Sequence, residues 1–358
     1  MIKKFDEVFV DKTRLGKKIP KEEYKKKGKY IIIDQGKDKI AGFTDNEDGI
    51  FTDVPTIIFG DHTRIIKYID KPFFLGADGV KVLKSKINNA NYKYLYYALK
   101  AAYIPNTGYN RHFKWLKKVS INYPSFEKQK RIVKLLDNLS EVKNKKNEEL
   151  KLCDTLIKAR FVEMFGDLKF DTPVSKYIES LTAGKSLAGK EKCTNKVLNT
   201  GAVSYDKFKN DYKYLPSNYV PDENNKVRTG NVLISRMNTQ ELVGATAYVW
   251  EVPENTYLPD RLWRANLKEN VNSIFLWQVL IHPLLKLQIQ RVSSGTSGSM
   301  KNISKSNFLK LKVPDVNEES QNKFASFVQQ VDKSKVAIQK SLDETQILFD
   351  SLMQKYFS

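Results

Sequence analysis

EKQKRIVKLLDNLSEVKNKKNEELKLCDTLIKARFVEMF, residues Glu127–Phe165, is the stretch that decides the fold of this 358-residue chain. It contains no Pro or Gly, and its apolar residues recur at steps of three and four or their multiples. That spacing predicts a long amphipathic helix with a coiled-coil seam, about 60 Å long. Lys143, Lys146 and Arg160 occupy seam positions between the apolar ones. An isolated helix with such a stripe needs a partner.

A second stretch without Pro or Gly, Gln321–Phe357, has a similar seam and is the predicted partner. An offset of 192 residues superposes Gln129 on Gln321 and Phe165 on Phe357. We expect the two helices to pack through apolar residues at corresponding spacings. These are Ile132, Leu136, Leu139, Leu150 and Ile157 in the first helix, and Phe324, Val328, Val331, Leu342 and Phe349 in the second.

The similarity continues upstream of both helices. There an offset of 190 places Gly108 on Gly298, Val119 on Leu309, Ile121 on Leu311 and Pro124 on Pro314, which predicts two residues inserted before the second helix. The alternative is two unrelated helices that share a stripe, and the matching Gly, Pro and Gln landmarks disfavour it. The sequence therefore predicts an internal duplication with a period near half the chain.

The segments that precede the helices read as mixed α/β domains with similar plans. In the first we expect strands at 30–34 and 54–60, strand pieces in 73–83, a helix at 91–103 and a strand at 115–123. In the second we expect strands at 196–199, 203–205, 232–234 and 245–250, one helix at about 273–291 and a strand at 308–313.

Positive charge is concentrated in these domains. The formal net charge of the chain is +20, with +11 in residues 1–124 and +8 in 167–314. The helical segments 125–166 and 315–358 contribute only +3 and −2. A basic surface that spares the helices indicates a polyanionic partner for the domains.

Several classes of protein do not fit the sequence. Cys153 and Cys193 lack the spacing of a zinc site or a disulfide framework, which favours a reduced cytoplasmic compartment. No apolar run is long enough to cross a bilayer, and the N-terminus has no apolar core of a signal peptide. We therefore predict a cytosolic protein with no membrane partner.

Catalytic motifs are also missing. Gly184-Lys185-Ser186 resembles the end of a phosphate-binding loop, but position 179 is Glu where that loop needs Gly. The Asp/Asn-Pro-Pro-Tyr/Phe run of adenine methyltransferases and the ordered Pro-Asp…Glu-x-Lys residues of metal nucleases are absent. The three His residues are too scattered to bind a metal. We predict a binding protein with no catalytic or metal site.

Polar loops at strand ends are the candidate binding sites. Residues 61–64 and 235–239 each follow a strand and supply Arg, Asn, Thr or His, which pair with base edges. The Gly-containing loops 106–111 and 293–301 suit phosphate. Taken alone, each loop is equally well explained as an ordinary solvated turn. Arg261 and Arg264 are equally well explained as structural residues that pair with Asp260 or Glu251. The candidate contacts to bases or phosphates are His62, Thr63, Arg64, Asn106, Thr107, Tyr109, Arg111, Lys185, Ser186, Ser235, Arg236, Asn238, Thr239, Arg261, Arg264, Ser297 and Lys301. Trp115 and Trp263 read as core residues.

The whole chain resembles the specificity subunit of type I restriction–modification systems. The first helix begins with PSFEKQKRIV at 124–133, close to the P-x-x-x-x-Q-x-R/K start of that family. IIFGDHTRIIKYIDKPFFLGADGVKV at 57–82 is similar to a common first recognition domain, and residues 232–239 and 259–264 to a common second one. The second helix start, PDVNEESQ at 314–321, departs from the pattern by two extra residues.

The resemblance implies an α/β (α+β) fold with two target recognition domains, 1–124 and 167–314, in a pseudo-twofold arrangement. The long helices, 125–166 and 315–358, would form an antiparallel coiled coil. Each domain would read one half-site of double-stranded DNA, and the helices would set the gap. Two methyltransferase subunits are the implied partners, with two restriction subunits as further partners. S-adenosylmethionine, ATP and Mg are expected on those subunits, with no cofactor in this chain, in a prokaryotic cytoplasm.

Two rival hypotheses come from other classes of protein. One is a scaffold that binds nucleic acid without reading sequence, which a fixed bipartite consensus would exclude. The other is a coiled-coil assembly protein whose basic domains contact proteins, which salt-insensitive behaviour without DNA retention would favour.

Overall fold

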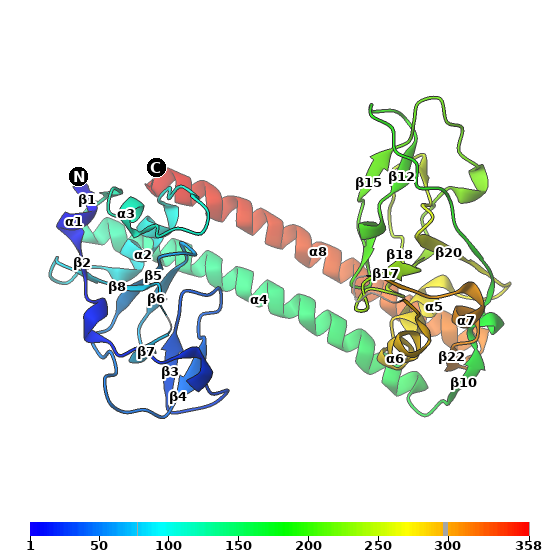
Figure 1. Ribbon diagram of the computed structural model, residues 1–358, viewed down its shortest axis with the longest axis horizontal. Helices are drawn as coiled ribbons and strands as arrows, with labels where there is room; N and C mark the ends of the chain where they lie inside the picture. Colours follow the sequence, from blue (N-terminus) through cyan, green and yellow to red (C-terminus); the bar gives the residue numbers. More distant parts are fainter. Residues whose placement is uncertain (77, 296–299, 358) are drawn as a thin grey trace. The chain divides into compact units, whose positions relative to one another are not determined.

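The computed structural model describes residues 1–76, 78–295 and 300–357, and the chain divides into two compact units (Figure 1). The first unit comprises Met1–Glu149 and Ile338–Ser358, and the second comprises Leu150–Ala337. Each unit therefore contains one globular part and a segment of both long helices.

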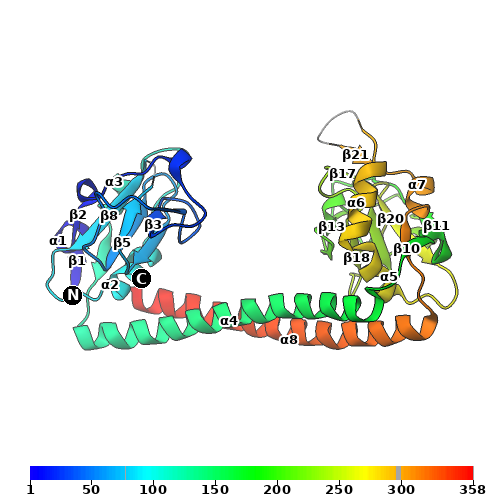
Figure 2. The same cartoon turned by 90° about the horizontal axis from the view of Figure 1, so that it is seen from below.

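The two predicted long helices are confirmed. Helix α4 spans Phe126–Phe165 and α8 spans Glu318–Phe357, so they begin one and three residues earlier than predicted. Figure 2 shows them side by side and running in opposite directions. Forty residues without Pro or Gly leave nothing in the backbone to interrupt either helix.

The seam between the helices is apolar where it meets a globular part and polar between. Lys143 on α4 donates to Gln346 on α8 in the first unit, and Lys335 donates to Asp154 in the second. Leu139, Leu150 and Leu342 are half-buried. The other expected packing residues are buried in the hydrophobic cores of the two units, namely Ile132, Leu136, Ile157, Phe324, Val328, Val331 and Phe349.

The first unit is built on a four-stranded antiparallel sheet in the order β2-β8-β5-β6. A three-stranded sheet, β4-β3-β7, pairs β3 and β7 in parallel, and β1 pairs with β9. Helix α2 packs against β5, β6 and β9. The elements are β1 (Ile2–Lys4), α1 (Phe5–Val8), β2 (Phe9–Asp11), η1 (Thr13–Leu15), η2 (Lys21–Glu23), β3 (Tyr30–Ile33), β4 (Gly42–Thr44), β5 (Thr56–Gly60), β6 (Ile66–Ile69), β7 (Phe73–Leu75), β8 (Val80–Ser85), α2 (Tyr92–Ala101), α3 (Phe113–Leu116) and β9 (Ser120–Asn122).

The second unit repeats this plan, which is why the duplication is visible in the sequence. Its four-stranded antiparallel sheet is β11-β20-β16-β18, its three-stranded sheet β15-β12-β19 pairs β12 and β19 in parallel, and β10 pairs with β22. Two small two-stranded sheets, β13-β14 and β17-β21, are added. The elements are β10 (Phe170–Pro173), η3 (Val174–Lys176), β11 (Ile178–Thr182), β12 (Lys196–Leu198), η4 (Thr200–Ala202), β13 (Val203–Ser204), β14 (Lys207–Phe208), β15 (Tyr212–Tyr214), η5 (Glu223–Asn225), β16 (Val232–Ser235), β17 (Met237–Asn238), β18 (Thr246–Tyr248), β19 (Thr256–Tyr257), β20 (Leu262–Leu267), α5 (Ser273–Leu280), α6 (Pro283–Val292), β21 (Lys301–Asn302), α7 (Lys305–Leu309) and β22 (Lys312–Pro314).

Three sequence predictions of secondary structure are wrong. The strand expected at 115–123 is the short helix α3 followed by β9, and the strand expected at 308–313 is the end of α7 followed by β22. In both places the apolar residues of a helical turn and of the following short strand together resemble the alternating pattern of a single strand. The single helix expected at 273–291 is two helices, because Pro283 begins α6 and cannot continue α5.

The predicted two-residue insertion before α8 is also wrong. Gln129 Nε2 donates to the Pro124 carbonyl at 3.0 Å, and Gln321 Nε2 donates to the Val316 carbonyl at 2.9 Å. Both partners lie five residues before the Gln, so the offset of 192 continues upstream through β9 and β22 and through α3 and α7. Pro314 therefore matches Asn122 rather than Pro124. Gly298, which was matched to Gly108, lies outside the described residues.

Candidate DNA-recognition site

The loop that follows β5 is held rigidly by a buried carboxylate. Asp61 is 4% exposed, and its Oδ1 accepts a hydrogen bond from the Phe113 amide at 2.7 Å. Its carbonyl accepts from the His112 amide, also at 2.7 Å. Asp61 thereby joins the end of the central strand to the start of α3, and fixes the residues between.

His62 and Tyr109 bring two of the candidate loops together. Their rings stack with centroids 5.0 Å apart and an interplanar angle of 13°. Tyr109 is 90% exposed, and it follows Gly108, whose φ of 77° suits glycine. Thr107 contacts His112, with 3.3 Å between its hydroxyl and Nε2. The stack presents a polar aromatic surface to solvent beside the end of β5.

The remaining candidates of the first unit lie around this stack. Arg64 has a positive φ of 61°, and its Nη1 donates to the Ile104 carbonyl at 3.1 Å. The Thr63 hydroxyl donates to the Gln35 carbonyl at 2.7 Å. Asn106 accepts from the Gly108 amide, and Arg111 is exposed. We call these seven residues the first loop cluster, and its members are His62, Thr63, Arg64, Asn106, Thr107, Tyr109 and Arg111.

The corresponding place in the second unit is the end of β16. Ser235 is fully buried, and its Oγ accepts from Asn238 Nδ2 at 3.3 Å, so it positions Asn238. The next residue, Arg236, extends over the ring of Trp263 at 5.5 Å. Its amide donates to the Arg261 carbonyl at 3.1 Å. Trp263 is 1% exposed, as expected of a core residue, and orients the guanidinium of Arg236.

The short pair β17-β21 joins the two expected loops of this unit. Asn238 lies opposite Lys301 in the ladder, and Lys301 Nζ donates to the Gly295 carbonyl at 2.9 Å. Thr239 donates its amide to Asn238 Oδ1. Ser297 lies outside the described residues. We call Ser235, Arg236, Asn238, Thr239, Arg261 and Lys301 the second loop cluster.

Three other candidates, Lys185, Ser186 and Arg264, lie outside the second loop cluster. Ser186 hydrogen-bonds to Asp260, and neither it nor the exposed Lys185 begins a helix, as a phosphate-binding loop would require. Arg264 donates to Asn266 Oδ1 at 3.1 Å and to the Lys226 carbonyl at 3.0 Å, not to Asp260 or Glu251. Burial, with Arg228 nearby, lowers the pKa of Arg264.

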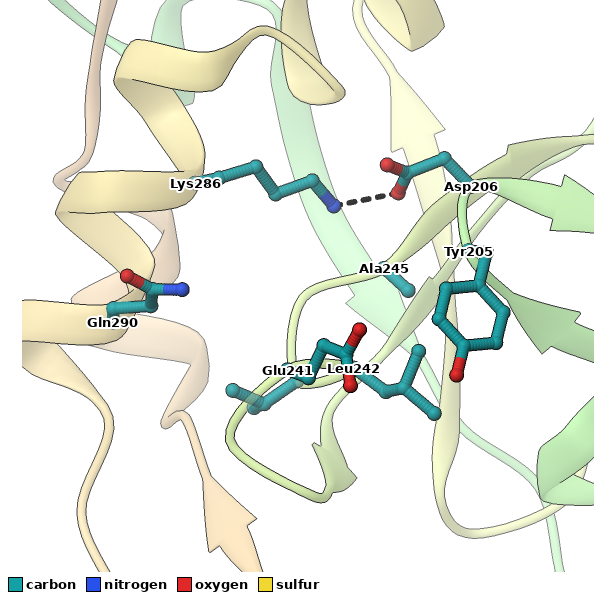
Figure 3. Close-up of a pocket in the computed structure, with 8 residues that line it drawn as sticks. Tyr205, Asp206, Glu241, Leu242, Ala245, Lys286 and Gln290 are labelled. Atoms are coloured by element: carbon teal, nitrogen blue, oxygen red, sulfur yellow. Dashed lines mark hydrogen bonds and ion pairs between the residues drawn. The ribbon is translucent and has the colours of Figure 1, made fainter. Parts of the chain in front are cut away.

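A small polar pocket of about 160 Å³ adjoins the second loop cluster (Figure 3). Lys286 on α6 pairs with Asp206 at 2.6 Å, and Asp206 also accepts from the Thr246 amide. Tyr205 and Asp206 form the turn of the β13-β14 hairpin with φ values of 51° and 59°. Such an angle is strained for Tyr205, whereas Asp tolerates it, and the contacts of Asp206 hold the turn.

Sequence reasoning did not find two other features that support the clusters, Gln35 and the turn at Tyr205 and Asp206. Gln35 ties two of the first unit's loops to its own, since it contacts His62 and Thr63 in one loop and Asp78 in the other. Gln35 lies far from these residues in the chain, so no local pattern could indicate it. The Tyr205–Asp206 turn lacks the Asn-Gly signal of its turn type.

Comparison with known proteins decides the family. A family model described as the type I restriction modification DNA specificity domain matches residues 1–152 and 181–346, well over half of the chain. The chain belongs to this family. The two matches fall on the two repeats, so it is a DNA specificity subunit with two specificity domains. The family implies DNA and other restriction–modification subunits as partners, and agrees with a non-catalytic role.

Solved structures share the fold. The S subunit of a type I restriction–modification system from M. genitalium is 19% identical with a TM-score of 0.66, and the match covers 100% of this chain and 96% of that one. A chain from a study of complex assembly and conformational transition of the type I R-M system is 16% identical with a TM-score of 0.52, covering 92% and 91%. A search of curated protein sequences finds no significant match. Within the described ranges, no helix is long and apolar enough to cross a membrane.

Proposed function

We propose that this specificity subunit reads a bipartite DNA target, with one half-site recognised by each loop cluster. The observation that carries the proposal is the repeated placement of the clusters. In both units polar and cationic side chains follow the same inner strand of the four-stranded antiparallel sheet, β5 in one and β16 in the other. The buried groups beneath them, Asp61 and Ser235, hold the loops in place before DNA arrives.

Base readout and phosphate binding divide between kinds of residue. Arg64, Arg236 and Asn238 have the donors that pair with base edges in the major groove. The exposed cations of the basic domains supply affinity that depends on salt, because they release counterions from the phosphates. Affinity then comes from many residues and specificity from few.

The helices α4 and α8 are the proposed spacer between half-sites. Each is continuous for 40 residues and belongs to both units. We propose further that two methyltransferase subunits dock on this subunit, bringing S-adenosylmethionine, and that restriction subunits bring ATP and Mg. Both cysteines are free, which suits the reducing cytoplasm of a prokaryote.

Methylome sequencing tests the proposal. A host expressing this chain with its neighbouring methyltransferase is compared with a host that expresses the methyltransferase alone. We expect one bipartite adenine motif that appears only when this chain is present. Soluble complex without any motif, or methylation without a fixed consensus, would contradict the proposal, the latter in favour of a scaffold that does not read sequence.

A further inference from the structure

The two repeats differ at one place where the second unit has a helix and the first has none. After α5, the chain of the second unit turns at His282 and forms α6, which packs on α5 and β22. Leu285 and Ile289 are buried. Gln288 accepts from the Lys312 amide at 2.7 Å and donates to the Lys312 carbonyl at 2.8 Å, so it pairs with the open edge of β22.

The first unit leaves the equivalent place open. The offset of 192 matches Lys312 with Ser120, and matches Phe165 with Phe357. Phe165 packs on Phe275 and is 2% exposed, whereas Phe357 packs on Tyr94 and is only half-buried. The N-caps Asn91 and Asn272 align α2 with α5, but the residues after α2 form no helix before α3.

A groove of about 540 Å³ lies there in the first unit. Tyr103 stands at its edge and is 86% exposed. The Trp115 indole N–H, within the described residues, is buried without an acceptor. The groove is lined by Ala101, Ala102, Tyr103, Pro105, Trp115, Lys118, Val119, Ser120 and Phe357.

We propose that this groove binds an amphipathic helix of a protein partner, in the place that α6 fills in the second unit. The occupant would present two aliphatic side chains four residues apart, as Leu285 and Ile289 are in α6, and these would cover Phe357. It would present an amide side chain to the backbone of Ser120, as Gln288 does to Lys312.

The positive charge beside the groove indicates which residue type flanks the two aliphatic side chains of the docked helix. Lys114 and Lys118 both lie over the Trp115 ring, at 5.5 and 4.8 Å from its centroid. An acidic residue on the helix would pair with them. Duplex DNA fits the groove poorly, because phosphates do not cover exposed aromatic and alanine surface. The proposed function includes a methyltransferase subunit as a protein partner, and we assign the docked helix to that subunit. The identity of the partner therefore rests on the proposed function.

The test uses the full chain and the methyltransferase encoded beside it. Tyr103→Asp places a charge at the groove without disturbing the core, because Tyr103 is exposed. Tyr109→Asp is the matched control, since it changes an equally exposed Tyr in the first loop cluster. We expect Tyr103→Asp to weaken methyltransferase binding about tenfold or more, with unchanged affinity of the isolated subunit for DNA. Tyr109→Asp should show the reverse pattern.

A photo-crosslinking residue at position 103 identifies the occupant. A crosslink in the assembled complex to a helix of the methyltransferase, with Leu or Ile four residues apart, is the expected result. A crosslink to DNA or to a second copy of this chain would overturn the proposal, as would the absence of a crosslink together with normal assembly of Tyr103→Asp. None of these outcomes changes the methylation motif, so failure here is distinct from failure of the bipartite reading.

Discussion

Lys335 Nζ on α8 lies 2.7 Å from Asp154 Oδ1 on α4. The offset of 192 between the repeats matches Lys335 with Lys143 and Asp154 with Gln346. In the first unit, Lys143 donates a hydrogen bond to Gln346. In each repeat, the lysine at this position of the long helix therefore contacts the long helix of the other repeat. Reciprocal contacts of this kind are the mark of an interface between two copies, here joined in one chain by duplication.

This reciprocity predicts different salt dependence for two matched variants. Lys335→Ala removes an ion pair and should cost about 1 kcal/mol of unfolding free energy at low salt, with less loss at high salt. Lys143→Ala removes a bond to a neutral amide and a contact with Phe349, so its cost should change little with salt. Urea unfolding at two ionic strengths measures both. The same salt dependence in the two variants would contradict the assignment.

The environment of Asp332 predicts that replacing this residue stabilises the protein, by an amount that depends on pH. Burial raises the pKa of Asp332 above its ordinary value, the charge of Lys335 opposes this rise, and Asp154 nearby adds to it. Because the folded pKa lies above the unfolded value, the ionised form costs stability at neutral pH, and this cost is lost progressively as the pH falls below the ordinary Asp pKa of 3.8.

Asp332→Ser tests this, because the first repeat has Ser140 at the matching position. We expect the variant to gain about 0.5 kcal/mol at pH 7, a value reduced for partial exposure, and to gain much less near pH 3.5. Thermal unfolding across this range measures the difference. A gain that is the same at both pH values would show that packing, not charge, is responsible.

Gln321 and Gln129 should differ in their contributions to stability. Gln321 makes two hydrogen bonds, to the Val316 carbonyl and from the Asn272 amide, which is the N-cap of α5. Gln129 Oε1 is buried without a partner in the described part of the chain. Gln321→Leu should therefore cost about 2 kcal/mol and Gln129→Leu about 1 kcal/mol or less. Denaturant unfolding of the two variants compares them, and equal losses would argue against a role for the Asn272 contact.

The long helices could be predicted because their periodicity is local and unbroken. The register of the duplication could not, because Pro124 and Pro314 offered a match that the hydrogen bonds of Gln129 and Gln321 overrule. The helix at α3 was missed for a similar reason. Four residues carry too little periodicity to distinguish a helical turn from a strand.

The candidate site was only partly within reach of the sequence. A loop after a strand, rich in Arg, Asn and Thr, is a local signal, and it indicated 61–64 and 235–239. The contact between His62 and Tyr109 depends on the packing of residues 47 positions apart in the chain. Only the fold could show that the two loops of the first unit form one cluster.

Arg64 and Arg236 make the most direct prediction about recognition. Arg64→Ala should relax specificity in one half-site and Arg236→Ala in the other, by about 10- to 100-fold per base, because each loop cluster reads its own half-site. Arg264→Ala is the control, since its guanidinium is engaged by Asn266 and the Lys226 carbonyl and should affect stability instead. Methylation of a library of degenerate targets reads both half-sites at once. If Arg64→Ala or Arg236→Ala lowers methylation equally on all sequences, that arginine contacts a phosphate, and base readout in that domain belongs to other members of its cluster.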